Sequence, residues 1–336
     1  MVYDCFTFFN ELDLLEIRLY TLKDVVDRFV ISEASRTHTG LPKELIFAKN
    51  RERFSVFADK IEYVVVDNLL SEEDVSKDTY NLPWVNENRQ RNALIRGLQD
   101  VHYEDIVMLS DVDEIPRPQS VLQAKKDLMG GVSSVRLELR SYNFYINYEN
   151  YSCPKWRLGT IAAKFGDLIR GSLLSGVKYD RYTQESENQG VALHKLRFAN
   201  PDLIIGDAGW HFSFLGGIDA IQRKLLAFSH SEFGSVPREI LEARIKNGCD
   251  LFGRNGKFFG VPLDSSFPEF IVNHSLRFSG LIFPVDEEYL RRTQFARMIA
   301  KIRGTAYRMV VKMVPDRLAP FIVRVRDMFM KKLGRI

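Results

Sequence analysis

The chain has 336 residues, of which 45% are hydrophobic and 27% charged, a balance typical of a folded protein rather than a disordered one. Its three cysteines, Cys5, Cys153 and Cys249, are odd in number, lie far apart and include no CxxC pair. We therefore expect reduced thiols, and the composition excludes a disulfide-rich secreted domain and a cysteine-based zinc site.

The start of the chain and its apolar runs bear on location. The opening segment MVYDCFTFFNELDLLEIRL lacks the basic start, the long apolar core and the small-residue cleavage site of a secretory signal. No stretch of the sequence approaches the roughly 18 uncharged apolar residues that a membrane-spanning helix needs. These features predict a cytoplasmic protein.

The net charge of +3 is unevenly distributed. Residues 291–336 contain 13 Lys and Arg but only two acids, Asp316 and Asp327, so the rest of the chain holds 34 basic and 42 acidic side chains, a net charge of −8. A basic tail on a mildly acidic body predicts that the tail meets an anionic surface.

Over the first 115 residues, apolar runs rich in β-formers alternate with amphipathic runs. Residues 11–21 place leucines at helical spacing after Asn10, a good N-cap, and residues 86–98 have a helical pattern. Strands are predicted at residues 2–9, 28–31, 61–66 and 105–110. The alternation indicates a doubly wound α/β sheet, in which ligands bind at the carboxyl ends of the strands.

The second half of the chain has a more β-rich and aromatic pattern. The segments that carry this pattern are residues 132–152, 156–165, 192–198 and 206–217. Helices are predicted at 218–231 and near 236–247. Because the sequence shows no internal repeat and no low-complexity linker, we expect the two halves to be continuous.

Two carboxylates, Asp111 and Asp113, directly follow the apolar run IVMLS. Two acids one residue apart at the end of a strand can both face a divalent cation, and their hard oxygen ligands suit Mg²⁺ or Mn²⁺ bridging to substrate phosphates. The structural alternative is that one Asp caps the turn before Pro116 while the other is solvated.

A second cluster spans residues 206–213 (GDAGWHFS), where small residues let the backbone approach a ligand. Asp207 offers a base and His211 a metal ligand, although a histidine beside Trp210 is also typical of a packed structural pair. Further polar residues could hold a nucleotide or pyrophosphate, or could simply be solvated. They are Glu33, Arg36 and Thr37 after the second strand, and Arg89, Gln90, Arg91 and Asn92 before the fourth.

Four segments of the chain resemble glycosyltransferase family 17. They are FFNELDLLEIRLYTLKDVVDRFVISEASRTHTGLPK, QRNALIRGL, DIVMLSDVDEIPRP and GWHFS, and they occur in the same order over roughly residues 4–285. The resemblance implies a GT-A-like fold and a β-1,4-N-acetylglucosaminyltransferase-like hexosyltransferase. It also implies a nucleotide-sugar donor such as UDP-N-acetylglucosamine, and transfer with inversion to a β-linkage.

The resemblance also implies roles for particular residues. Asp111 and Asp113 resemble the metal and diphosphate motif, with His211 as a further metal ligand and Mn²⁺ or Mg²⁺ as the ion. The expected division of the chain is a glycosyltransferase domain at 1–290, with a nucleotide-sugar half at 1–130 and an acceptor half at 131–290, followed by the tail at 291–336.

The expected chemistry needs a base and an acceptor site. A carboxylate would deprotonate the acceptor hydroxyl, and Asp207 is the first candidate with Glu138 as the alternative. Trp156, Arg157 and Trp210 are candidates for contacting the acceptor, a glycan or a lipid-linked sugar, whereas most other aromatic residues of this β-rich half should pack in the core. Nothing in the sequence indicates nucleic-acid binding.

The tail contains two amphipathic segments, residues 305–314 and 321–333, separated by Pro315 and Pro320. Basic amphipathic helices that carry Phe and Met can lie in a lipid interface, which predicts a peripheral location on the inner face of a membrane. The alternative is that these helices pack their apolar faces on the body.

Two other functional classes fit parts of the pattern. Phosphohydrolases of the haloacid-dehalogenase kind also place DxD after an apolar strand, with the first Asp as nucleophile. Against this class, the motif arrives after three earlier strands, and Glu114 and Ile115 follow where Thr or Val is expected. An inactive sugar-binding homologue would keep the fold without turnover.

Overall fold

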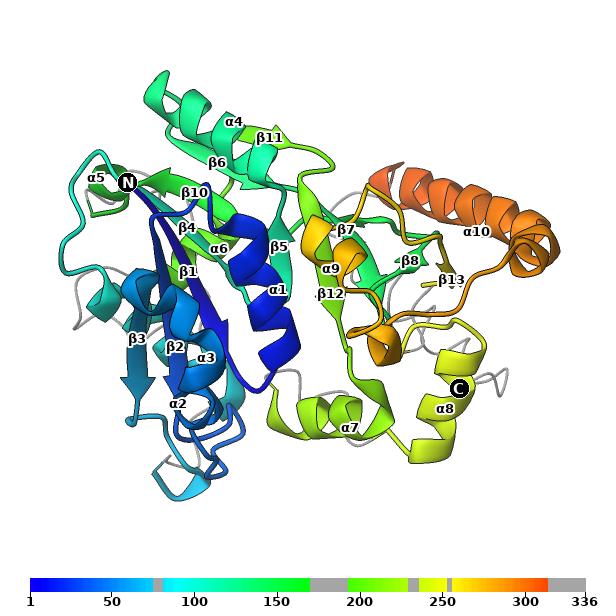
Figure 1. The fold of residues 1–336 in the computed structure, drawn as a ribbon, viewed down its shortest axis with the longest axis horizontal. Helices are drawn as coiled ribbons and strands as arrows, with labels where there is room; N and C mark the ends of the chain where they lie inside the picture. Colours follow the sequence, from blue (N-terminus) through cyan, green and yellow to red (C-terminus); the bar gives the residue numbers. More distant parts are fainter. Residues whose placement is uncertain (75–80, 170–192, 229–235, 253–255, 314–336) are drawn as a thin grey trace.

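The computed structural model describes residues 1–74, 81–169, 193–228, 236–252 and 256–313. Two mixed β-sheets form its framework, and Figure 1 shows the first, with its helices, beside the second. The predicted class is confirmed as an α/β fold with a doubly wound, mostly parallel sheet and a more β-rich second half.

The first sheet has seven strands and carries most of the N-terminal half. Its strands, in spatial order, are β11 (Leu203–Ile205), β6 (Ser134–Leu137), β10 (Ile161–Lys164), β4 (Ile106–Asp111), β1 (Val2–Phe8), β2 (Arg28–Ala34) and β3 (Ile61–Val66). β10 is antiparallel to both of its neighbours, whereas the other pairs are parallel. The strands predicted at residues 2–9, 28–31, 61–66 and 105–110 are therefore confirmed as β1, β2, β3 and β4.

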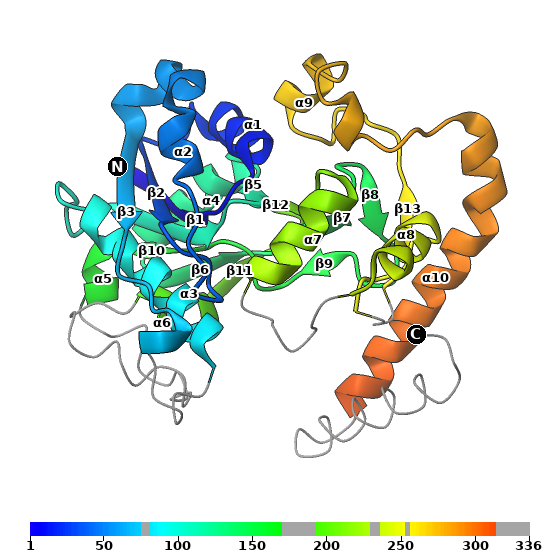
Figure 2. The ribbon, with the colours of Figure 1, turned by 90° about the horizontal axis from the view of Figure 1, so that it is seen from below.

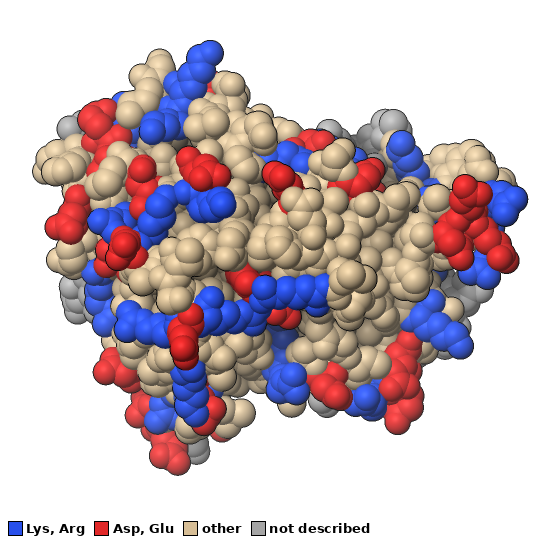
Figure 3. All heavy atoms as spheres, viewed as in Figure 1, with Lys and Arg blue, Asp and Glu red and all other residues tan. Residues whose placement is uncertain are grey.

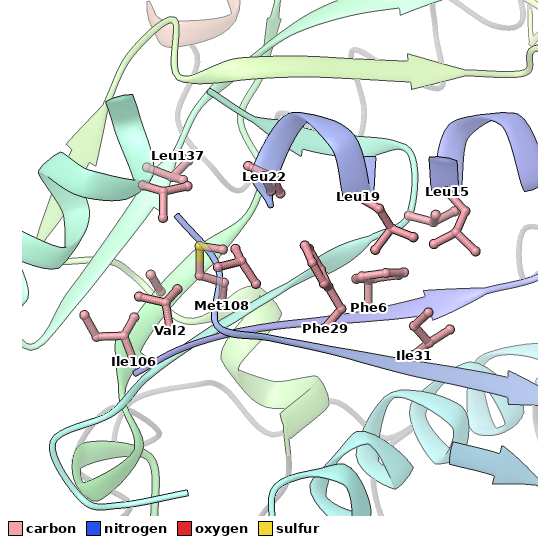
Figure 4. Close-up of a cluster of buried hydrophobic side chains, with 14 of the residues drawn as sticks. Val2, Phe6, Leu15, Leu19, Leu22, Phe29, Ile31, Ile106, Met108 and Leu137 are labelled. Carbon is pink, nitrogen blue, oxygen red and sulfur yellow. The ribbon is translucent and has the colours of Figure 1, made fainter. Parts of the chain in front are cut away.

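Both faces of the first sheet are covered, which explains why its strands are apolar on both sides. On one face, α1 (Leu12–Leu22) packs its buried leucines against the strands, as Figure 4 shows. The labelled members of this cluster are Val2, Phe6, Leu15, Leu19, Leu22, Phe29, Ile31, Ile106, Met108 and Leu137. Burying one such leucine contributes about 2 kcal/mol, so the cluster is a main source of stability.

The opposite face is covered by α3 (Leu82–Asn92), the 3₁₀ helix η3 (Ala93–Gly97) and α6 (Leu193–Phe198). The predicted helix at 86–98 corresponds to α3 followed by η3. Where Gly97 faces the sheet, a Cβ would meet Val30 Cγ1 at 2.4 Å, so this glycine permits close packing of η3 on β2.

The second sheet has β13 (Phe258–Gly260), β8 (Tyr148–Asn150), β7 (Leu139–Asn143), β12 (Gly209–Ser213) and β5 (Glu114–Pro116) in that order, with β9 (Lys155–Trp156) paired to β7. β4 of the first sheet and β5 of the second are separated by two residues only. The short connection Val112–Asp113 therefore joins the two sheets.

Further helices surround these sheets. They are α2 (Ile46–Lys49), η1 (Arg51–Lys60), η2 (Glu72–Asp74), α4 (Pro118–Met129), α5 (Phe165–Ile169), α7 (Gly217–Ala227), α8 (Arg238–Lys246), α9 (Glu269–Asn273), η7 (Ser279–Leu281) and α10 (Glu287–Met313). The helices predicted at 218–231 and near 236–247 correspond to α7 and α8. Residues 305–313 belong to α10, whereas the predicted segment 321–333 lies outside the described residues.

Two local expectations are wrong. Residues 192–198 have a β-like pattern, but Leu193–Phe198 forms α6, because the Asn92 side chain accepts the backbone N–H of His194 and the buried leucines pack on the sheet. Asn10 is not the N-cap of α1: the cap position is Glu11, whose carboxylate accepts the N–H groups of Asn10 and Phe9 at 3.0 and 3.3 Å. In both cases a tertiary or neighbouring side chain overrides the local propensity.

No helix within the described ranges is long and apolar enough to cross a membrane.

His194 should make stability depend on pH. Burial, followed by the positive charges of Lys195 and Arg91, lowers its pKa to about 4, whereas the unfolded residue titrates near 6.5. The unfolded chain therefore binds the proton first, and the stabilisation is fully present above about pH 6.5 and is lost as the pH falls towards 4.

In urea denaturation, we expect the wild type to lose about 2 kcal/mol of unfolding free energy through this residue between pH 7 and 4.5. His194→Gln should show a flatter pH profile. The exposed His102 gives a matched control, since His102→Gln should follow the wild type. Parallel profiles for wild type and His194→Gln would contradict the assignment.

Candidate active site

The turn at Asp111–Glu114 is held by one fully buried arginine, Arg18 of α1. Its Nη1 donates to the carbonyl oxygens of Asp111 at 3.0 Å and Glu114 at 2.7 Å. Its Nε and Nη2 donate to the two carboxylate oxygens of Asp4 at 2.7 and 2.6 Å. One guanidinium therefore links the centre of the first sheet to the backbone of the DxD turn, and the paired carboxylate compensates the buried charge.

Asp111 lies at the end of β4 between two guanidinium groups. Arg91 Nη1 is 2.8 Å from its Oδ1 and Arg197 Nη2 is 3.1 Å from its Oδ2, while the Thr7 hydroxyl lies 3.2 Å from Oδ1. Burial opposes ionisation, but Arg197 and Arg91 outweigh it and lower the pKa of Asp111. The side chain is still 34% exposed, so one face of this ionised carboxylate is open to a ligand.

Asp113 faces two other partners. Its Oδ1 lies 3.7 Å from His211 Nε2, and its Oδ2 accepts from Lys224 Nζ of α7 at 3.0 Å. Lys224 Nζ also lies 3.2 Å from Glu11 Oε1. Although burial acts against the charged ammonium, the carboxylates of Asp113 and Glu11 raise the pKa of Lys224, so this cation is permanent at neutral pH.

His211 is brought to the turn by strand pairing. β12 is antiparallel to β5 with His211 opposite Glu114, and the N–H of Phe212 donates to the Asp113 carbonyl at 2.8 Å. The imidazole stacks on Trp156 with a centroid separation of 4.3 Å. Burial lowers the pKa of His211 despite the opposing charges of Asp113 and Glu114, so the ring is neutral at pH 7.

Glu114 connects the turn to α6 and to the aromatic wall. Its carboxylate is fully buried and accepts two hydrogen bonds from Arg197, at 2.5 and 2.6 Å, and one from Trp156 Nε1 at 2.5 Å. The bidentate geometry fixes Arg197, which also reaches Asp111. Glu114 therefore positions both a cation and an indole at the site.

Of the nucleotide candidates, Arg91 belongs to this cluster, whereas Glu33, Arg36 and Asn92 lie elsewhere. Glu33 is fully buried at the end of β2, where its oxygens accept from Lys43, Tyr63 and the first amides of α2. Arg36 donates to the Gly40 carbonyl at 3.0 Å in the loop after β2. The Asn92 side chain accepts the backbone N–H of His194 in α6 at 3.0 Å. For Glu33 and Asn92, this geometry favours a structural role.

The two candidate bases, Glu138 and Asp207, lie near each other. The N–H of Ala208 donates to the Glu138 carbonyl. The Glu138 carboxylate lies 2.5 Å from Lys155 Nζ and 3.8 Å from Arg157 Nε. Asp207 is exposed, has a left-handed backbone (φ 50°), and its carboxylate pairs with guanidinium groups at 3.3 and 3.4 Å.

The three acceptor candidates differ in accessibility. Trp156 is half-buried and contacts both His211 and Glu114, and Arg157 is exposed beside Glu138. Trp210 is buried in an apolar cluster, with Nε1 donating to the Ser266 carbonyl at 3.2 Å, and this placement favours a structural role. The expectation that most aromatic residues of this half pack in the core is confirmed for Tyr142, Phe144 and Tyr148.

Sequence reasoning missed five residues of this cluster: Glu11, Arg18, Glu114, Arg197 and Lys224. A buried arginine or lysine needs an acid as partner, so a basic residue on the apolar face of a predicted helix is a usable signal. Arg18 carries this signal in the sequence, because it lies between Leu15 and Leu19 on a predicted helix. In the structure all residues of this run are buried. The partners themselves have no local signal.

Carboxylates, a neutral imidazole and fixed cations meet at the carboxyl edge of a doubly wound sheet, the edge at which proteins of this architecture bind their ligands, and the fixed cations suit a phosphorylated ligand. The comparison with known families is more specific. The model of glycosyltransferase family 17 matches residues 1–165, so the resemblance drawn from the sequence motifs is confirmed.

Curated relatives carry the same name in three mammals. Residues of this chain align with the β-1,4-mannosyl-glycoprotein 4-β-N-acetylglucosaminyltransferases of Homo sapiens and Rattus norvegicus at 25% identity over 244 residues. The alignments cover 67% of this chain and 42% of each relative, so the chain spans less than half the length of the relatives it matches.

Solved structures show only a distant likeness. A putative nucleotide-diphospho-sugar transferase from Desulfovibrio desulfuricans G20 matches with a TM-score of 0.30 and 12% identity, covering 75% of this chain and 96% of that one. A 4-diphosphocytidyl-2C-methyl-D-erythritol synthase from Anaerococcus prevotii matches with a TM-score of 0.32 and 12% identity, covering 61% and 86%.

Replacing Arg18 tests the anchor of the turn. Arg18→Lys keeps a positive charge, but one ammonium cannot reach the Asp4 carboxylate and the turn carbonyls together. We expect the free energy of unfolding to fall by about 3 kcal/mol, the range typical of a broken buried ion pair, as measured by urea denaturation. Arg28→Lys is the control, because the Arg28 side chain is 40% exposed and lies 4.0 Å from Glu62. A change as large in this variant would contradict a special role for Arg18.

Proposed function

We propose that the protein is an inverting, metal-dependent glycosyltransferase that moves a sugar, N-acetylglucosamine by similarity, from a UDP-sugar to a glycan or lipid-linked acceptor with a β-linkage. The observation that carries this proposal is the position of Asp111 at the carboxyl end of β4, followed by Asp113, whose Oδ1 lies 3.7 Å from His211 Nε2. The family match and the names of the curated relatives supply the reaction class.

Three cations surround the DxD turn and suit a diphosphate. Arg91, Arg197 and Lys224 each lie within hydrogen-bonding distance of a carboxylate in the turn. A nucleoside diphosphate that approaches this edge meets positive charge that is already positioned and desolvated, which strengthens the interaction. The fixed cations would therefore support both donor binding and departure of the diphosphate.

The residues also suit a hard divalent cation whose remaining ligands come from the substrate. Asp113 Oδ1 and His211 Nε2 face each other, and the Nδ1 of this neutral imidazole has no hydrogen-bond partner among the described residues. The described ranges contain no set of three or more His, Cys, Asp or Glu side chains that could hold a metal ion by themselves. A metal bound here would therefore need further ligands from substrate phosphates and water, which Mg²⁺ commonly uses in proteins.

We propose that Asp113 and His211 hold Mn²⁺ or Mg²⁺, with the open face of Asp111 beside them. The ion would offset the negative charge that develops on the leaving diphosphate. The Lys224 ammonium already pairs with the carboxylates of Asp113 and Glu11. The carboxylate of Asp113 would therefore be shared between this ammonium and the metal.

In the proposed transfer, a carboxylate takes the proton of the acceptor hydroxyl, and the hydroxyl oxygen attacks the anomeric carbon. The bond from that carbon to the diphosphate oxygen breaks on the opposite face, and the nucleoside diphosphate leaves with the electron pair, which inverts the configuration. Trp156 and Arg157 would border the acceptor sugar.

Position favours Glu138 over Asp207 as the base. Glu138 directly follows β6, and Asp111 is the last residue of β4. Because β6 and β4 both pair with β10, the two residues lie at the same edge of the first sheet. Two inter-strand spacings correspond to about 10 Å, room for a sugar between diphosphate and base. Asp207 instead directs its carboxylate to Arg117 and Arg140.

We further propose a cytoplasmic, peripheral location at a membrane, which a lipid-linked acceptor would require and which the basic composition of residues 291–336 supports.

Donor and metal binding can be tested together. We expect UDP-N-acetylglucosamine with Mn²⁺ to raise the melting temperature of the full chain, by about 4 °C or more at saturation, and EDTA to abolish the shift. Asp113→Asn should lose the shift because it removes a carboxylate ligand. Asp24→Asn changes an exposed acid outside the cluster and should retain it.

Stabilisation by UDP-sugar that survives EDTA would leave the donor class intact and refute the metal. No response to any nucleotide would refute the proposed function.

The base can be identified from steady-state kinetics of two isosteric variants. Glu138→Gln should lower kcat by about 100-fold or more with little change in the donor KM, because proton transfer contributes in the transition state only. Asp207→Asn should retain near-normal turnover. The reverse pattern would assign the base to Asp207.

A further inference from the structure

Helix α10 (Glu287–Met313) presents two different faces. Its inner face packs on the second sheet: the Tyr289 hydroxyl accepts the N–H of Gly260 at 2.9 Å, and Ala300 is buried. At Gly304 a Cβ would lie 2.0 Å from the carbonyl oxygen of Ser152, so the helix backbone touches the body there. The spacing of Tyr289, Ala300 and Gly304 places them on one side of the helix.

The outer face carries an apolar stripe. Phe295, Met298 and Ile302 are 68%, 51% and 59% exposed, and their i, i+3, i+7 spacing aligns them along the side opposite the inner face. Figure 2 shows α10 along the outer edge of the molecule, away from β1–β3 and with one side turned outwards. Three large apolar side chains in a row on an exposed helix indicate a contact surface.

Positive charge surrounds this stripe. Arg291, Arg292, Lys301 and Arg303 are exposed next to it, and residues 289–303 contain no Asp or Glu. The two acids of the helix, Glu287 and Glu288, lie in its first turn, where they complement the helix dipole. Elsewhere the signs are mixed: on the face in Figure 3, basic and acidic side chains are interspersed over the N-terminal half.

We propose that this outer face of α10 lies in the interface of an anionic lipid membrane. The apolar stripe of Phe295, Met298 and Ile302 would enter the boundary between headgroups and acyl chains, while the flanking guanidinium and ammonium groups contact lipid phosphates. The proposal concerns described residues that precede the amphipathic segments predicted from the sequence, and it does not depend on the glycosyltransferase activity.

Charge distinguishes this partner from a second copy of the chain. If two copies of the stripe met, four cations of each would be brought close to four of the other, which is unfavourable when charges lie within a Debye length. An anionic surface removes this repulsion and adds attraction to each basic side chain. The stripe is also narrow for a stable dimer, since only three apolar side chains carry it.

The test is flotation of the full chain with vesicles of phosphatidylcholine alone and of phosphatidylcholine with phosphatidylglycerol. The variant replaces Phe295, Met298 and Ile302 by Ser. Its matched control replaces three exposed apolar residues outside α10, Val56 of η1, Leu122 of α4 and Ile204 of β11, by Ser. Circular dichroism and melting temperature establish that each variant is folded.

We expect the wild type and the control to float with the anionic vesicles only. The partition coefficient of the stripe variant on these vesicles should be lower by about tenfold or more. Equal flotation of the stripe variant and wild type, or no flotation of either, would overturn the proposal. Binding of the wild type to neutral vesicles as strong as to anionic ones would overturn the role of the cations.

A wild-type dimer in light scattering that becomes monomeric in the stripe variant would assign the surface to a second copy instead. Since nucleotide binding is measured separately by thermal shift, failure of the membrane proposal and failure of the proposed function give different results.

Discussion

Arg18 and Asp4 form an ion pair in which neither side chain is exposed, at the point where α1 crosses the centre of the first sheet. The same guanidinium donates hydrogen bonds to the carbonyl oxygens of Asp111, Val112 and Glu114, which belong to the turn between the sheets. A buried turn of this kind has backbone acceptors that no strand ladder satisfies, and one cation satisfies three of them.

The rest of the site is built outward from this fixed turn by alternating charges. On one side, Arg91 and Arg197 flank Asp111, and Glu114 fixes Arg197. On the other side, Lys224 lies between Asp113 and Glu11. Burial opposes the ionisation of Asp111 and Glu11, but the neighbouring cations lower the pKa of both carboxyl groups, and these charges are already positioned when a charged ligand binds. The arrangement is thus prepared for phosphate chemistry by the protein's own residues.

Local periodicity was a reliable guide wherever the local pattern and the tertiary environment agree. The four strands and α1 have apolar patterns, and their observed ends lie within three residues of the predicted ones. Residues 192–198 failed because a short run does not distinguish helix from strand, and contact with Asn92 and the sheet decides it. Asp111 and Asp113 were found because they end a strand, whereas Glu33 has the same position but turns inward.

The sequence by itself determined the fold class, the family resemblance and the place of the DxD turn, because buried strands, helix faces and motifs each leave a pattern within a few adjacent residues. Only the tertiary structure decided which charges meet. Arg197 and Lys224 reach the turn from 83 to 111 residues away along the chain, and α10 shows its stripe to solvent because its other face is packed. Such pairings depend on separation in space and on loss of water, which sequence spacing does not encode.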